Sequence, residues 1–264
     1  MNKDICIIIP ARLASKRFPN KVLQCIAGLP MIEHVRRRCL LSKATTRVYV
    51  ATCDEQISQV VKSNGGDVIM TSKDHLNGTS RVAEAARMVD CDHVILVQGD
   101  EPLLHPDYLS SLCEVISENP LVNAWNVSSP IENDYELDQI SVVKCAESKS
   151  NQILYCSRKN TSQYDFKKNS GYLRKLLGLM AYKKDFLQTL VSIGPGTIEQ
   201  IEDIEQMRII ENGFELRSMH VPNSLPSVNE PHEITAVMEY LQKDKEQMAL
   251  LQKILVNEEK VIRL

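Results

Sequence analysis

The chain of 264 residues is 43% hydrophobic and 25% charged, with a formal net charge of −3. This length suits one large domain with a sizeable core, and the slightly acidic balance argues against broad nucleic-acid binding, which needs a basic face. The apolar runs are far shorter than the roughly 18 residues of a membrane span, and the short run after Asp4 has the wrong shape for a signal peptide.

The first expected element is a buried strand at residues 5–9, an apolar run rich in β-branched residues. Pro10 ends it, because proline cannot donate to a sheet ladder. The loop that follows contains no acid and carries four cations: Arg12, Lys16, Arg17 and Lys21. Since open α/β sheets bind ligands at the carboxyl ends of their strands, this loop predicts a polyphosphate site. A solvated basic loop has the same composition and remains the alternative.

Helices and strands then alternate along the first half of the chain. Helical spacing and capping residues predict helices over residues 31–41, 54–61 (capped by Asp54), 78–89 and 106–118. Apolar β-branched runs predict strands over residues 47–52, 68–70 and 93–97. This order is typical of an α/β fold with a doubly wound, mostly parallel, Rossmann-like sheet.

An acid pair follows the strand at residues 93–97. The sequence there is Gln98-Gly99-Asp100-Glu101-Pro102. Mg²⁺ prefers one or two carboxylates together with phosphate oxygens, so an acidic strand end beside a basic loop predicts a metal–nucleotide site. The alternative for Asp100 is a helix N-cap ahead of Pro102.

The second half of the chain does not continue the alternation. Strands are expected over residues 142–145, 152–155, 173–182 and 215–221, and helices over 183–191, 198–210 and from Pro231 to about 251. Residues 159–170 are polar and are expected to be mobile. This half is expected to form an α+β extension of the first.

The eight cysteines are scattered and include no Cys-x-x-Cys pair. This pattern favours buried free thiols in a reducing cytoplasm over disulfides or a zinc site. We therefore expect a cytoplasmic protein.

Six segments taken together resemble the motifs of the 3-deoxy-manno-octulosonate (Kdo) cytidylyltransferases, in the same order along nearly the whole chain. They are residues 10–21, 75–81, 98–102, 157–158, 172–182 and 204–208. The resemblance implies a nucleotidyltransferase fold, in which CTP and a 2-keto sugar acid give a CMP-sugar and pyrophosphate with Mg²⁺ as cofactor. The anomeric hydroxyl would attack the α-phosphorus in line, so the protein mostly positions the reactants and neutralises charge.

The resemblance also implies residue roles. The catalytic residues would be Arg12, Lys21 and Asp100. The residues implied to bind CTP are Ala11, Arg12, Ser15, Lys21, Ser80 and Arg81; for Arg81, at a helix start that favours anions, a surface ion pair is the alternative. The residues implied to bind the acceptor are Gln98, Arg158, Tyr182, Glu205 and Gln206, the last two having a solvated helix face as their alternative. Asp100 and Asn229 would hold the metal.

A single cytidylyltransferase domain over residues 1–264 is therefore expected. Residues 1–130 would be the CTP-binding core, 131–230 the acceptor and dimerisation part, and 231–264 a C-terminal helix. The family also implies a homodimer that binds no nucleic acid or membrane, and that supplies an activated sugar to a bacterial surface polysaccharide such as lipopolysaccharide.

Three departures lie on the acceptor and metal side. Asn229 stands where the family has a metal-binding Asp, and Glu230 is the possible substitute. Residues 175–177, Lys-Leu-Leu, replace a His that faces the sugar and make this stretch one residue longer. Residues 159–161 replace a Pro-containing turn. We infer that CTP is retained, whereas the acceptor is Kdo, an amino-Kdo, another 2-keto sugar acid, or a smaller carboxylate or phosphonate.

Three other functions compete with this interpretation. A sugar-1-phosphate nucleotidyltransferase would have a glycine-rich opening loop, but residues 10–21 contain no Gly. A glycosyltransferase would use an Asp-x-Asp pair, which residues 98–101 match poorly. A catalytically silent CTP-binding module would bind CTP without turnover, with Asn229 as the disabling change.

Overall fold

The computed structural model describes residues 4–15, 17–43, 47–159 and 172–261. A single large sheet has the order β11-β7-β10-β6-β1-β4-β5, and β8 and β9 extend it from β10. Its strands are β1 (Ile5–Ala11), β4 (Val48–Thr52), β5 (Asp67–Met70), β6 (His93–Val97), β7 (Ala124–Pro130), β8 (Lys144–Glu147), β9 (Ile153–Ser157), β10 (Leu173–Lys183) and β11 (Arg217–His220). Strands β2 (Cys25–Ile26) and β3 (Leu29–Pro30) form a separate hairpin.

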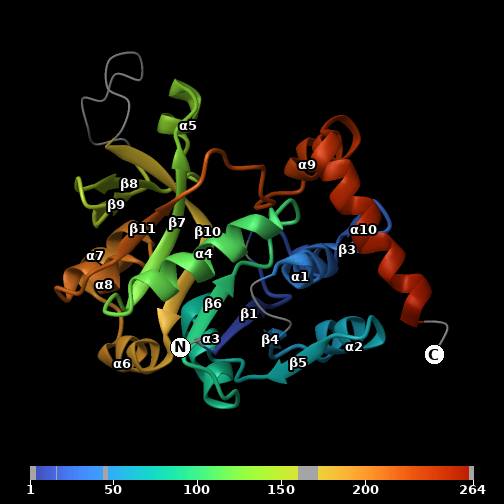
Figure 1. Cartoon of the computed structure of the whole chain (residues 1–264), viewed down its shortest axis with the longest axis horizontal. Helices are drawn as coiled ribbons and strands as arrows, with labels where there is room; N and C mark the ends of the chain where they lie inside the picture. Colours follow the sequence, from blue (N-terminus) through green and yellow to red (C-terminus); the bar gives the residue numbers. More distant parts are fainter. Residues whose placement is uncertain (1–3, 16, 44–46, 160–171, 262–264) are drawn as a thin grey trace.

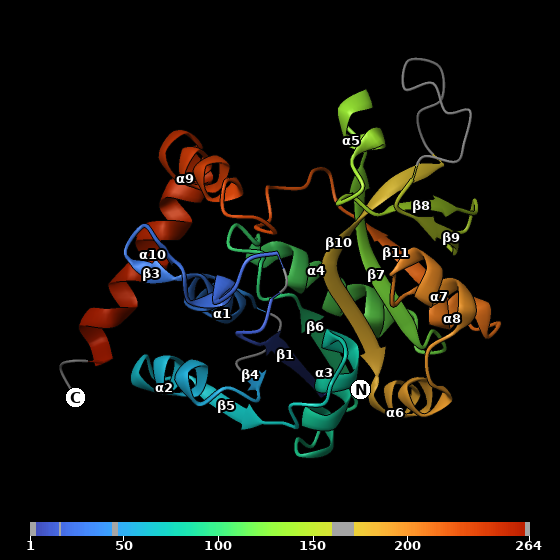
Figure 2. The same ribbon diagram turned by 180° about the vertical axis from the view of Figure 1, so that it is seen from behind.

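Helices cover both faces of this sheet (Figures 1 and 2). They are η1 (Lys21–Leu23), α1 (Met31–Leu41), α2 (Glu55–Ser63), α3 (Gly78–Arg87), α4 (Pro106–Glu118), α5 (Asp134–Asp138), α6 (Lys184–Ile193), α7 (Thr197–Glu202), α8 (Met207–Glu211), α9 (Glu233–Lys243) and α10 (Lys245–Val261). None of the helices in the described part of the chain combines the length and apolarity that a membrane crossing requires.

Strand β1 lies at the centre of the fold and separates two apolar cores. Ile7 and Ile9 pack into the core shared with α1, α2 and α4, whereas Cys6 and Ile8 face the core shared with α3, α6 and α8. Successive side chains of a strand point to opposite faces, so an uninterrupted apolar run is what a strand covered on both sides requires. The α/β fold expected from the sequence is confirmed.

The sheet is mixed where the second half of the chain joins it. β1 pairs in parallel with β4 and β6, whereas β10 runs antiparallel to both β6 and β7. The sequence analysis missed β7 and did not foresee that a strand of the extension would lie between β6 and β7. The extension is therefore continuous with the first sheet.

A third apolar cluster joins segments that are distant in sequence. Phe18 of the opening loop, Leu103 beyond β6, Val228, and Val237 of α9 pack together and are all buried. The cluster fixes the loops at the carboxyl ends of β1 and β6 against the segment before α9.

The prediction of a single helix over residues 198–210 is wrong. α7 ends at Glu202, its C-cap Asp203 adopts a left-handed conformation with φ of 54°, and α8 begins at Met207. The isoleucines and methionine at strict three-residue spacing drift by about 60° per step around a helix of 3.6 residues per turn, so they do not share one face. Ile201 is accordingly 76% exposed. A buried two-pronged pair between Arg208 and Glu199, with both N–O distances 2.7 Å, joins the two helices.

Two smaller expectations also need correction. The terminal helix is divided into α9 and α10 at Asp244, whose Oδ1 accepts a hydrogen bond from Gln247 N at 2.8 Å and caps α10. Asp54 precedes α2, but its side chain makes no cap. Its Oδ2 instead accepts a hydrogen bond from Leu13 N at 2.8 Å. The polar stretch at residues 159–170 lies outside the described residues except for Lys159.

Helix α1 buries a charged cluster beneath α10. The Glu33 carboxylate has no exposed surface, and it accepts hydrogen bonds from Arg36 Nε and Nη2 and from Arg37 Nε at 2.7–3.0 Å. Arg37 Nη1 also donates to the carbonyl of Ile254 at 2.8 Å. One buried carboxylate thus neutralises two guanidinium groups that hold α10 and the chain around Asn64.

We expect Glu33→Gln to lower the free energy of unfolding by about 3 kcal/mol, because removing one partner of a buried ion pair leaves the other charges uncompensated. Urea unfolding monitored by circular dichroism measures this change. Glu239→Gln is the control, since its pair with Lys243 is solvent-exposed and should contribute less than about 0.5 kcal/mol. Equal losses for the two variants would contradict the assignment.

Candidate functional site

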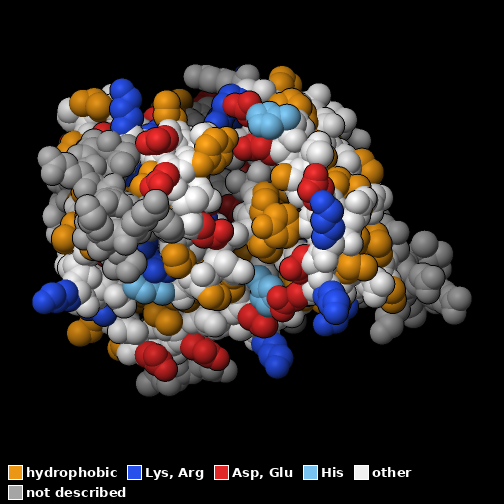
Figure 3. Space-filling view, turned by 90° about the horizontal axis from the view of Figure 1, so that it is seen from above, with side chains coloured by type: hydrophobic (Ala, Val, Ile, Leu, Met, Phe, Trp, Pro, Cys, Tyr) orange, Lys and Arg blue, Asp and Glu red, His pale blue; other side chains and the backbone are white. Residues whose placement is uncertain are grey.

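The basic loop and the acid pair meet at one edge of the sheet. β1 and β6 are parallel neighbours, so the chain leaves both of them at the same edge. There Lys21 Nζ donates to Asp100 Oδ2 at 2.7 Å, with the two side chains 12% and 25% exposed. Seen from this side, the described residues present both acidic and basic side chains around a hollow (Figure 3). The pairing that the sequence suggested between the two loops is therefore present.

Backbone N–H groups of the opening loop hold it in place through hydrogen bonds. Leu13 N donates to Asp54 and Asn20 N donates to the Leu13 carbonyl at 3.0 Å. Ser15 Oγ accepts from Phe18 N at 3.4 Å. Ala11 is the buried last residue of β1 and offers a ligand only its backbone. Lys16 lies outside the described residues.

Two cations of this loop are exposed. Arg12 Nη1 lies 3.5 Å from the carbonyl of Leu76, and Arg17 Nη2 donates to Asn229 Oδ1 at 3.2 Å. Neither guanidinium has a carboxylate partner among the ion pairs of the described residues. Both are therefore available to an anion above the loop.

The segment that carries Asn229 lies beside Asp100, and the metal assignment stays a prediction. Val228 N donates to the Asp100 carbonyl at 2.9 Å, which aligns the two segments. Glu230, the possible substitute ligand, has its carboxylate 3.5 Å from His232 Nδ1. Across the described ranges, no three His, Cys, Asp or Glu side chains form a metal-binding group. A carboxylate and an amide oxygen fit Mg²⁺ only where phosphate and water complete the shell.

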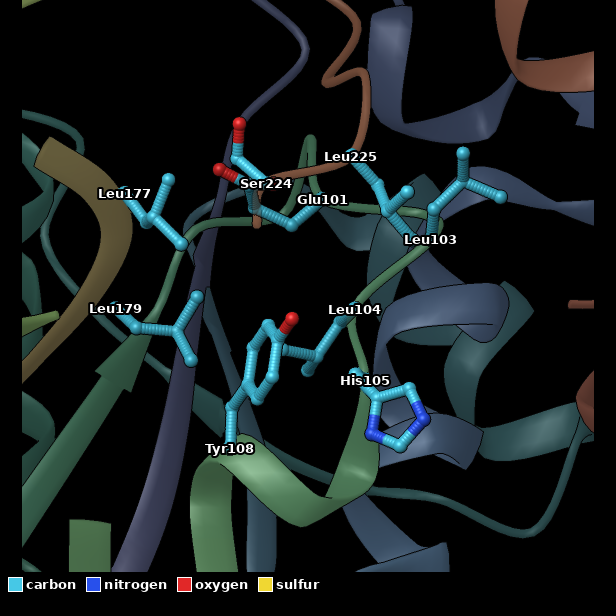
Figure 4. A pocket seen from close by; sticks show the side chains of 9 residues that line it. All are labelled: Glu101, Leu103, Leu104, His105, Tyr108, Leu177, Leu179, Ser224 and Leu225. Carbon is cyan, nitrogen blue, oxygen red and sulfur yellow. The ribbon is translucent and has the colours of Figure 1, made fainter. Parts of the chain in front are cut away.

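Glu101 has a different environment from Asp100. Figure 4 shows it at a pocket lined by leucines from three segments: Leu103, Leu104, Leu177, Leu179 and Leu225. Burial in these apolar surroundings, reinforced by the charge of Asp100, raises the pKa of Glu101 to about 8. Gly178 N donates to its Oε1 at 3.1 Å. The two adjacent acids are thus differentiated by their surroundings.

Three of the expected acceptor residues, Gln98, Glu205 and Gln206, lie near one another in the fold or share partners there. Gln98 and Gln206 are half-buried, and Gln206 Nε2 donates to Asn126 Oδ1 at 2.8 Å. The carboxylate of Glu205 accepts from Thr79 N at 3.0 Å at the start of α3, and burial raises its pKa. Asn126 was missed by the sequence analysis because the strand that carries it, β7, was missed.

Tyr182 and Arg158 have protein partners in this structure. Tyr182 is buried, and its hydroxyl lies 3.2 Å from Met180 Sδ. Arg158 donates to three carbonyl oxygens, those of Glu202, Asp203 and Ile140, at 2.7–3.2 Å. Its donors stabilise the carboxyl end of α7, and its pairing with the carboxylate of the acceptor stays a prediction.

Arg81 and Ser80 also serve the local fold. Arg81 is buried and its Nη1 donates to Thr71 Oγ1 at 2.6 Å and to the Ser72 carbonyl at 3.2 Å. The alternative of a surface ion pair is therefore wrong, because Arg81 is buried, whereas its contact with CTP stays a prediction. Ser80 N donates to Asn77 Oδ1 at 2.9 Å, the N-cap of α3. Both residues order the chain that enters α3.

Comparisons with known proteins agree with this geometry. The family described as “Cytidylyltransferase” matches residues 6–218. The chain is 37% identical over 248 residues to the 3-deoxy-manno-octulosonate cytidylyltransferase of Geobacter sulfurreducens, with 90% of this chain and 99% of that protein covered. It is 36% identical over 242 residues to the 8-amino-3,8-dideoxy-manno-octulosonate cytidylyltransferase of Shewanella sp. (strain W3-18-1), with 88% and 96% covered.

A solved structure is also similar to the whole fold. It is that of a CMP:2-keto-3-deoxy-manno-octonic acid synthetase complexed with CTP. It matches with a TM-score of 0.84 at 32% identity, and the match covers 91% of this chain and 99% of that one.

We expect the raised pKa of Glu101 to make the protein less stable as the pH rises. The folded chain keeps this proton up to a pKa of about 8, whereas the unfolded chain releases it near the ordinary value of 4.5. Between these values the unfolding free energy falls by at most about 1.4 kcal/mol per pH unit from this group. Glu101→Gln should flatten that part of the profile.

Urea unfolding of wild type and Glu101→Gln from pH 4.5 to 8.5, with a chelator present, measures the effect. The stability difference should change steadily with pH above about 5, in favour of the variant. A constant difference across the range would show that Glu101 is ionised in the folded protein at neutral pH.

Proposed function

The chain belongs to the cytidylyltransferase family, and on that premise we propose that it transfers CMP from CTP to the anomeric hydroxyl of a 2-keto-3-deoxy sugar acid, Kdo or a Kdo-like sugar, and releases pyrophosphate. The observation that carries this proposal is the meeting of a glycine-free cationic loop with Asp100. Lys21 and Asp100 lie 2.7 Å apart at the carboxyl ends of two adjacent parallel strands. The similar synthetase was solved with CTP.

The triphosphate would lie over the opening loop. Arg12 and Lys21 offer positive charge there, and Ala11 and Ser15 lie in the same segment. Ser80 lies in the first turn of α3, where its N–H already donates to Asn77 Oδ1, so we propose that it contacts CTP through its side chain. These donors would neutralise the charge that develops on pyrophosphate as it leaves, which is the main contribution a protein makes to such a transfer.

Mg²⁺ would be held by Asp100 and Asn229 together with the triphosphate. Bound there, it would neutralise phosphate charge and fix the geometry of the transfer. Arg17, which donates to Asn229 Oδ1, orients the amide oxygen. One carboxylate oxygen of Asp100, Oδ2, accepts from Lys21, and the side chain is partly exposed. The carboxylate would therefore remain open to a cation.

The acceptor would lie between β6, β10 and α8. Gln98, Gln206 and Glu205 present polar groups there, and Asn126 orients the Gln206 amide. Lys175, which stands near the position of the family's histidine, is buried and paired with Glu136. It therefore does not replace that histidine, and the acceptor contact on this side differs from the family pattern.

We also propose that the protein is a homodimer in the cytoplasm. Its product would be a CMP-activated sugar for a bacterial surface polysaccharide. Support for a dimer comes from the β8–β9 hairpin. β9 pairs only with β8 among the described strands, and it exposes Leu154 and Tyr155. Exposed apolar side chains on this hairpin are suited to subunit contact.

Pyrophosphate release from CTP and Mg²⁺ tests the function across a panel of acceptors: Kdo, 8-amino-Kdo, sialic acid, small carboxylates and small phosphonates. We expect release with an eight-carbon 2-keto-3-deoxy sugar acid. The departures at residues 159–161 and 175–177 make a different acid the second candidate, and the panel identifies it by the highest kcat/KM. CTP binding with no turnover on any acceptor would instead support a silent CTP-binding module.

Asn229→Asp tests the metal assignment. A unit charge about 4 Å from a cation contributes about 4 kcal/mol at an effective dielectric constant of 20. The Mg²⁺ concentration that gives half-maximal rate should therefore fall about 10-fold or more. Asn133→Asp is the control, since Asn133 caps α5 away from the site. An unchanged Mg²⁺ dependence would place the second ligand elsewhere.

A further inference from the structure

The Gln98 side chain is held between two glycines. A Cβ built on Gly178 would lie 2.9 Å from Gln98 Cβ and 3.1 Å from its Cγ. On the other side, a Cβ on Gly78 would lie 3.3 Å from Gln98 Nε2 and 3.2 Å from Pro10 Cγ. The space for this side chain therefore depends on the absence of a methyl group on either flank.

Gly178 contacts both sides of the acid loop. Its carbonyl accepts from Gln98 N at 2.8 Å, and its N–H donates to Glu101 Oε1 at 3.1 Å. A Cβ at this position would also lie 2.6 Å from that carboxylate oxygen. One residue of β10 thus contacts the residues on either side of Gly99-Asp100.

A bulge in β10 creates this close approach. Between the pairs Leu176–Ser128 and Met180–Asn126, β10 contains three residues and β7 contains only Val127. The surplus residues include Gly178, and the residues on either side of it, Leu177 and Leu179, line the pocket that Glu101 enters (Figure 4). A bulge re-aims the strand locally, and the extra length noted in the sequence at residues 175–177 is absorbed beside it.

We propose that Gly178 is a positioning residue for the acceptor, acting through Gln98 and Glu101, an inference that rests on the proposed function. The φ angle of Gly178 lies outside the left-handed region, so the backbone itself accepts alanine. What the position requires is room for the two neighbouring side chains. A methyl group there would move Gln98 away from the acceptor and press on Glu101 while leaving the triphosphate loop unchanged.

Gly178→Ala tests this, with Gly66→Ala as a matched control. Gly66 also lies outside the left-handed region, and its Cβ would meet Val61 Cγ1 at 2.6 Å, as tight a contact, far from the site. We expect Gly178→Ala to raise the KM for the acceptor, or lower kcat with it, by about 10- to 100-fold. The KM for CTP should stay within about two-fold. A merely structural glycine would lower Tm in both variants without separating the two KM values.

A second readout keeps the inference separate from the proposed function. The side-chain amide signal of Gln98 in a ¹⁵N–¹H spectrum, identified by its loss in Gln98→Ala, should shift in Gly178→Ala and stay in place in Gly66→Ala. If wild type transfers no CMP, the proposed function fails, and this shift still decides whether Gly178 places Gln98. If Gly178→Ala does not fold, Gly78→Ala approaches Gln98 from the other side and should shift the same signal.

The inference is overturned by any of three results. The first is that the acceptor KM and kcat of Gly178→Ala lie within two-fold of wild type. The second is that Gly66→Ala changes these constants equally. The third is that the Gln98 amide signal does not move in the folded variants of Gly178 and Gly78.

Discussion

The site depends on one apolar cluster that lies outside both main cores. Phe18, Leu103 and Val228 are buried together against α9. They belong to the opening loop, the loop after β6 and the segment before the C-terminal helices, which are distant in sequence. Burying these side chains stabilises the convergence of three mainly polar segments, which like-charge repulsion and loop entropy would otherwise oppose. The contacts of Lys21 with Asp100, and of Arg17 with Asn229, follow from that convergence.

The two adjacent acids illustrate how surroundings assign chemistry. Asp100 faces the cationic loop and is partly exposed, and it pairs with Lys21. Glu101 points to the leucine-lined pocket and receives the Gly178 N–H. Desolvation raises the pKa of Glu101 to about 8, which favours its protonated form at neutral pH, whereas Asp100 is the acid that we propose for a cation. Two adjacent carboxylic acids thus differ in charge and partners because the fold places them in different surroundings.

The sequence predicted a helix or strand correctly where the residues of that element alone carried the hydrophobic pattern. The helix at residues 31–41, the helix at 106–118 and the strand at 93–97 match α1, α4 and β6. The helix at 198–210 failed because apolar residues spaced by three do not stay on one face, and the left-handed Asp203 divides it. Strand β7 was missed although its buried Trp125 and Val127 belong to the core. Asn126 and Ser128 alternate with them and are also buried, so the run is not continuously apolar.

The sequence by itself determined the fold class, the cationic loop, the acid pair and the family, since these depend on short runs and ordered motifs. Only the tertiary structure decided which polar groups are free. Arg158 and Arg81 resemble ligand contacts in sequence, and in the structure protein oxygens accept hydrogen bonds from three donor atoms of Arg158 and from Nη1 of Arg81. Hydrogen-bond partners of buried groups come from segments distant in the chain, and desolvation makes their satisfaction compulsory. For the same reason the space that Gly178 leaves for Gln98 cannot be read from the chain, because it exists only where β10 bulges in its pairing with β7.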